Sequence, residues 1–210
     1  MIINSGIIEI GALYEFVQND ITNASIKGRS VEGKIYGKEV KRITQNISDE
    51  GGFYIWGSYN HKLLWNNIYI GKAGFFKTTG LRSRIREELK DERQFLWKIK
   101  MEEDNILKLC EMHYQNMFYK YSKEWRRHFK KFNTTHIIWV AIDNQISERK
   151  ILTIESDIIE TMNPFGNLSR PKPFSELQDS TIEIIRRFKH HIHENRSLKP
   201  FIPGEFKLQN

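Results

Sequence analysis

Two short segments, residues 52–58 and 67–73, place the strongest constraint on the fold of this chain. In both, β-branched and aromatic residues alternate with small or polar ones, a pattern typical of strands. The connector between them, residues 59–62, contains turn-forming residues. We therefore predict that the two segments pair as an antiparallel hairpin.

Further segments carry apolar residues at helical spacing. A helix of about three turns is predicted over residues 6–18, another beginning near residues 79–81, and a long helix or two in tandem over residues 104–132. Two more are expected over residues 147–162 and 179–191.

Residues 136–143 form a near-continuous apolar run, which indicates a buried central strand. The basic, glycine-broken segment from residue 24 to residue 48 favours a solvated loop with a short helix over a nucleic-acid arm. Together these patterns predict one compact, mixed α/β (α+β) domain with a small sheet.

The charge balance favours a polyanionic partner. Lys and Arg number 33 against 26 Asp and Glu, for a formal net charge of +7. Nucleic acid is the first expectation, although composition alone decides it only weakly.

Cysteine content and hydropathy exclude several classes of protein. The single cysteine, Cys110, excludes an intramolecular disulfide framework and a zinc site of several thiolates. No stretch approaches the roughly 20 apolar residues that a membrane span needs, and no signal peptide is recognisable. A cytoplasmic protein without a membrane partner is expected.

Two charged residues, Glu155 and Arg84, lie at positions from which they could take part in catalysis or binding. Glu155 falls within the apolar face of the predicted helix over residues 147–162, where an unpartnered carboxylate would be costly. A metal ion or a basic side chain is expected to meet it, and the alternative is a helix-edge glutamate that reaches solvent or pairs with a nearby lysine. Arg84 lies at the edge of the apolar stripe of its helix and, taken by itself, is better explained as a surface arginine than as a phosphate ligand.

The order of these residues resembles the GIY-YIG nuclease family. Gly52-Phe53-Tyr54 resembles the GIY element, and Tyr69-Ile70-Gly71 is the YIG element as written. Leu81-Arg82-Ser83-Arg84 is similar to the Leu-x-x-Arg of that family, and Glu155 with the later Asn167 is similar to its terminal helix and following Asn.

This resemblance implies a mainly antiparallel three-stranded sheet flanked by helices. It also implies a nuclease core over residues 51–168 with a helical insertion over about residues 100–134. Residues 1–50 are then an N-terminal helical, basic extension packed on the core, and residues 169–210 a C-terminal helical extension.

The resemblance also implies residue roles. Glu155 would be the ligand of one divalent metal ion, Mg²⁺ or Mn²⁺, and Arg84 would bind the scissile phosphate. Tyr69 or Tyr54 would position or deprotonate the attacking water, with Lys72 as the supporting cation or the base itself. Asn167 is expected to fix the catalytic groups by hydrogen bonds.

Glu88 departs from the family, whose members often have His or Tyr one turn after the arginine. Its carboxylate could pair with Arg84 at i,i+4, which could hold the arginine away from phosphate, or it could be a second acidic group near the metal. The sequence leaves both interpretations open.

Basic residues in two segments, 38–42 and 120–131, are expected to contact DNA phosphates. The aromatic stripe of residues 104–132 is interpreted as core, and its opposite face is basic. The predicted contacts are Lys38, Lys41, Arg42, Lys120, Lys123, Arg127, Lys130 and Lys131. A zinc site at His190, His191 and His193 is disfavoured, because no familiar ligand set accompanies them.

The function predicted from these observations is a metal-dependent endonuclease of double-stranded DNA, of the type II restriction or defence kind. A homodimer on the DNA would serve to cut both strands. The alternatives are a structure-specific repair or recombination nuclease, and a non-catalytic DNA-binding module that retains the fold.

Overall fold

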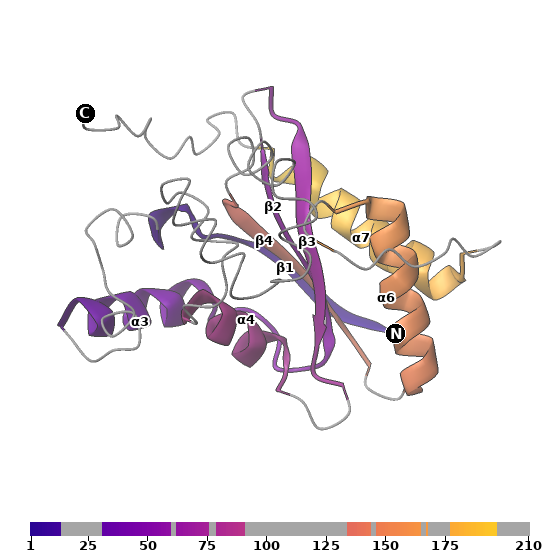
Figure 1. The fold of residues 1–210 in the computed structure, drawn as a ribbon, viewed down its shortest axis with the longest axis horizontal. Helices are drawn as coiled ribbons and strands as arrows, with labels where there is room; N and C mark the ends of the chain where they lie inside the picture. The colour runs from indigo at the N-terminus through magenta and orange to yellow at the C-terminus, as the bar shows by residue number, and fades with distance from the viewer. Residues whose placement is uncertain are drawn as a thin grey trace, which may run out of the picture.

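The centre of the protein is a four-stranded antiparallel sheet with the order β1-β4-β2-β3 (Figure 1). The computed structural model describes residues 1–13, 31–59, 62–75, 79–90, 134–143, 146–164, 167 and 177–196. The strands are β1 (Ile2–Glu9), β2 (Gly52–Tyr59), β3 (Trp65–Ala73) and β4 (His136–Ile142). The mixed α+β class is confirmed, but the expectation of three strands is wrong.

The additional strand comes from the N-terminus. The helix predicted over residues 6–18 is wrong at its start, because β1 extends to Glu9 and only a short 3₁₀ helix, η1 (Gly11–Leu13), follows; residues 14–18 lie outside the described residues. β1 pairs antiparallel with β4, with Ile7 opposite Ile138. Residues 2–9 therefore belong to the core sheet and not to a helical extension.

The predicted hairpin and the predicted central strand are both confirmed. β2 and β3 pair antiparallel, with Tyr54 opposite Gly71 and a register shift after Trp56. β4 lies between β1 and β2, and every one of its residues is buried. Burial on both faces explains why its sequence is almost continuously apolar.

Helices cover both faces of the sheet. In Figure 1, α3 (Val31–Ile43) and α4 (Leu81–Lys90) lie on one side of the strands, whereas α6 (Glu148–Met162) and α7 (Asp179–Glu194) lie on the other. α4, α6 and α7 begin within a few residues of the predicted positions. α3 is longer than the short helix expected among residues 24–48.

Strand alternation assigns side chains to the two faces. Phe53, Ile55 and Ile70 belong to one apolar cluster with residues of α6 and α7. Tyr54 and Trp56, at the intervening positions of β2, point to the face that carries α3 and α4. The residues of the predicted site are therefore divided between the two faces of the hairpin.

The predicted long helix over residues 104–132 lies outside the described residues, as does the insertion over residues 100–134 except for its last residue. Of the predicted C-terminal extension, α7 is described, and its buried residues Ile184, Ile185 and Phe188 join the core. Within the described ranges, no helix combines the length and apolar content needed to cross a membrane.

Candidate active site

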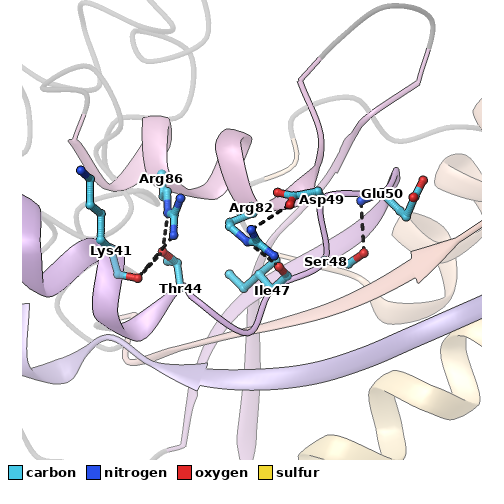
Figure 2. Close-up of polar contacts among 8 residues, drawn as sticks. All are labelled: Lys41, Thr44, Ile47, Ser48, Asp49, Glu50, Arg82 and Arg86. Atoms are coloured by element: carbon cyan, nitrogen blue, oxygen red, sulfur yellow. Dashed lines mark hydrogen bonds and ion pairs between the residues drawn. The ribbon is translucent and has the colours of Figure 1, made fainter.

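α4 is docked by two of its arginines, which leaves the third for a different role. Arg82 donates to the carbonyl of Ile47 at 2.7 Å and pairs with Asp49 at 2.8 Å (Figure 2). Arg86 donates from Nε to Thr44 Oγ1 at 2.7 Å (Figure 2). These contacts join α4 to residues 44–49, the segment that follows α3. Arg82 and Arg86 therefore have structural partners that Arg84 does not share.

Arg84 instead belongs to a buried polar cluster with Tyr54 and Glu88. Tyr54 donates its hydroxyl to Glu88 Oε1 at 2.5 Å. Arg84 Nε lies 2.9 Å from the same oxygen. The Glu88 side chain is only 3% exposed, whereas that of Arg84 is 41% exposed. The predicted i,i+4 pair is present, and a buried tyrosine completes it.

Burial sets the electrostatics of this cluster. Desolvation raises the pKa of Glu88, although the Tyr54 hydroxyl and the Arg84 guanidinium favour its charged form. Desolvation and the charge of Glu88 raise the pKa of Tyr54 well above its usual range. A phenol so reluctant to ionise is a poor base, so Tyr54 is better suited to hydrogen bonding.

Tyr69 lies beside this cluster on β3. Its ring centroid is 6.3 Å from that of Tyr54, and its side chain is partly exposed. Gly71, two residues on, is required because a Cβ there would lie 2.5 Å from the hydroxyl of Tyr54. Gly71 thus makes room for the ring of Tyr54.

The opposite face of β3 carries the second charged group. Lys72 Nζ donates to Glu155 Oε2 on α6, and both side chains are partly exposed. The sequence led us to expect a metal ion or a basic side chain at Glu155, and Lys72 is such a basic partner. Glu155 lies at the edge of the helix face formed by the buried Ile151, Ile154 and Ile158.

Asn167 fastens the outer edge of β3. Its Nδ2 donates to the carbonyl of Ile70, and its Oδ1 accepts the amide of Ile70, each at 2.8 Å. The side-chain amide thereby takes the place that a further strand would occupy beside β3. Asn67 donates to the carbonyl of Met162 at 2.6 Å, so the C-terminal end of α6 is also tied to this strand.

The residues present suit only one kind of metal site. Among the described residues, no group of three or more His, Cys, Asp or Glu side chains could hold a metal ion. Glu155 offers one carboxylate that solvent can reach. Magnesium commonly binds through one or two carboxylates and keeps several waters, so a hydrated divalent ion fits this donor. Glu88 does not fit, because its buried carboxylate leaves no room for the waters that such an ion keeps.

The other predicted positions are dispersed. Lys38 and Lys41 are exposed on α3, whereas Arg42 is bound through two hydrogen bonds to Glu39. The remaining predicted DNA contacts, Lys120, Lys123, Arg127, Lys130 and Lys131, lie outside the described residues. On α7, His191 contacts Ser5 Oγ and His193 lies beside Glu194.

Sequence reasoning missed two features of the site. Glu88 was recognised as a partner of Arg84 but not of Tyr54, because that contact depends on how α4 packs on β2. Asn67 belongs to no motif that is recognisable in the sequence.

No family model, curated protein or solved structure matches this chain.

Proposed function

We propose that this protein is a metal-dependent DNA endonuclease of the GIY-YIG type, which hydrolyses phosphodiester bonds. The observation that best supports the proposal is a connected set of contacts around residues 69–72 of β3. The six residues singled out in the sequence, namely Tyr54, Tyr69, Lys72, Arg84, Glu155 and Asn167, all lie on this strand or are linked to it by the contacts above.

In this proposal, Arg84 binds the phosphate and Glu155 holds the ion. The partly exposed guanidinium of Arg84 would donate hydrogen bonds to the phosphate oxygens. Because Arg84 and Glu155 lie on opposite faces of the hairpin, the phosphate would meet both around the outer edge of β3, where Mg²⁺ bound at Glu155 would supply positive charge to the phosphate and its leaving oxygen. Lys72 would keep the Glu155 carboxylate oriented, and Asn167 would hold the backbone of β3 in place.

Tyr69 is the better candidate for handling the attacking water. Tyr54 is buried and its pKa is raised, and the Lys72 ammonium already donates to Glu155. Tyr69 is partly exposed and lies within electrostatic reach of the Arg84 guanidinium. In hydrolysis, the water oxygen bonds to phosphorus, one bridging P–O bond breaks, and the water proton leaves through the base.

The test is cleavage of a mixed duplex DNA substrate in Mg²⁺ by the wild type and by Glu155→Gln. We expect the substitution to lower the cleavage rate by about 100-fold or more, because it weakens the only described anchor for the ion. Removing divalent ions with a chelator should abolish cleavage by the wild type. Glu160→Gln, an exposed substitution on the same helix, is the matched control and should cleave normally.

Equal cleavage by Glu155→Gln and the wild type would overturn the assignment of the site. The second candidate, a non-catalytic DNA-binding module, is favoured by the bond between Arg84 and Glu88, which occupies one edge of the guanidinium. Salt-sensitive DNA binding without cleavage in any divalent metal would select that module.

The substrate class within the nucleases is a separate question. We propose a restriction or defence enzyme that cuts double-stranded DNA at a short sequence, with a homodimer as the species that cuts both strands. Sequencing the product ends distinguishes the possibilities. A recurring motif supports sequence recognition, whereas ends placed at junctions or flaps support a structure-specific repair nuclease.

A further inference from the structure

Glu88 occupies a position where an apolar side chain would be expected. It lies on the buried face of α4 together with Leu81, Ile85 and Leu89. A carboxylate at such a site is costly unless it is bonded, and a leucine there would carry no such cost. A costly buried charge next to candidate site residues is a reason to look for a functional role.

The bonding of Glu88 is concentrated on one oxygen. Oε1 accepts from the Tyr54 hydroxyl at 2.5 Å and from Arg84 Nε at 2.9 Å. Oε2 is buried and makes no hydrogen bond of ordinary geometry among the described residues, although the indole N–H of Trp56 lies close enough to favour the charged carboxylate. The carboxylate therefore joins Tyr54 and Arg84 at a single point.

Two simpler roles do not fit this geometry. An ordinary surface i,i+4 pair would be exposed at both ends, yet Glu88 is 3% exposed. A metal ligand would need access for the waters that a divalent ion keeps, and burial denies that access. The remaining role for Glu88 is to orient its partner Arg84, whose side chain is 41% exposed.

We propose that Glu88 is a positioning residue, which holds the Nε edge of Arg84 against Tyr54 and so directs the rest of the guanidinium to a DNA phosphate. The carboxylate restrains the arginine on the protein side, while the exposed part of the side chain carries the donors for the ligand. Tyr54 is the other anchor of the same carboxylate, and Gly71 keeps space for its ring. This role rests on the proposed nuclease function.

The test is a double-mutant cycle between Glu88 and Arg84, measured by single-turnover cleavage in Mg²⁺. Glu88→Gln should lower the cleavage rate by about 10-fold to 100-fold, because a neutral amide restrains the guanidinium less firmly. In an Arg84→Ala background, Glu88→Gln should change the rate by less than about twofold, since the group it positions is gone. Glu87→Gln, the exposed neighbour on α4, is the control and should behave as wild type.

Equal losses in both backgrounds would overturn the proposal, as would full activity of Glu88→Gln. A purely structural role predicts loss of thermal stability in parallel with activity. We expect Glu88→Gln to melt close to the wild type, because the amide keeps the size of the side chain and the partner charge on Arg84 stays in contact with solvent. If the wild type does not cleave, the nuclease proposal fails, and the same cycle measured on affinity for a DNA duplex still tests Glu88. If it neither cleaves nor binds, both proposals fail.

Discussion

His136, the first residue of β4, shows how one buried side chain can set the acid limit of a fold. Its ring packs against Tyr59 and Trp65, with centroids 5.3 and 6.2 Å away, and its Nδ1 lies 2.7 Å from Thr135 Oγ1. Burial lowers the pKa of His136 to about 4. Protonation of this ring in the folded protein is therefore unfavourable until the pH is well below the usual range for histidine.

The resulting prediction concerns stability in acid. Between pH 6.5 and 4 the unfolded chain binds a proton at His136 that the folded chain does not, so stability present above pH 6.5 is lost as the pH falls. The loss from this residue is about 3 kcal/mol at most. His136→Phe should reduce the acid-dependent loss in urea unfolding experiments run from pH 7 to pH 4.

The exposed His193 provides the control, because His193→Phe should leave that dependence unchanged. An unaltered pH dependence in His136→Phe would show that other groups, such as His191, whose pKa burial also lowers, set the acid limit.

At the residue scale, the sequence indicates which residues to single out better than it predicts which of them are in contact. The spacing of Arg84 and Glu88 offers their ion pair as one of two interpretations, because residues four apart on a helix are neighbours, and the structure shows that pair. The same spacing says nothing of Tyr54, since that bond joins residues 34 apart in the chain. Nor does the sequence distinguish the surroundings of the two tyrosines, whereas the structure does, because Tyr54 is buried and Tyr69 is partly exposed.

Among the elements, β1 is the one that local sequence patterns misassign. Its apolar residues Ile7 and Ile8, with Ile10 and Leu13 after them, fit a helical period as well as a strand. Its partner β4 lies about 130 residues later in the chain, and a local pattern carries no information on that pairing. β4 itself is predictable, because its burial on both faces leaves a continuous apolar run.

The placement of β1 can be tested by paired substitutions within the strand. Ile8 is buried, so Ile8→Ala should lower the free energy of unfolding by about 2–4 kcal/mol. Ile3 is 55% exposed, so Ile3→Ala should change it by less than about 0.5 kcal/mol. Urea denaturation measures both. If the two substitutions had equal, small effects, β1 would not be an integral strand of the core sheet.

At the scale of the whole molecule, the net charge is +7, and basic side chains lie close together where α3 meets α4. Arg86 Nη2 lies 3.4 Å from the carbonyl of Lys41, and Lys90 Nζ lies near Gly37 of α3. Burial lowers the pKa of Lys90, and the charges of Lys41 and Arg86 lower it further. This repulsion would be relieved by an anionic ligand, and the Arg84 cluster lies on the same helix.

This arrangement leads to a prediction for DNA binding. If Lys41 and Lys90 contact phosphates, replacing both by Gln should weaken binding of a DNA duplex and reduce the slope of log affinity against log salt by about 2, because each phosphate contact contributes about 0.9. Arg186→Gln with Lys189→Gln removes equal charge from exposed positions of α7, across the sheet, and should leave the slope nearly unchanged. Binding is measured without divalent metal, so that cleavage does not interfere. Equal slopes for the two double variants would mean that DNA responds to net charge alone and would remove the α3–α4 face from the binding surface.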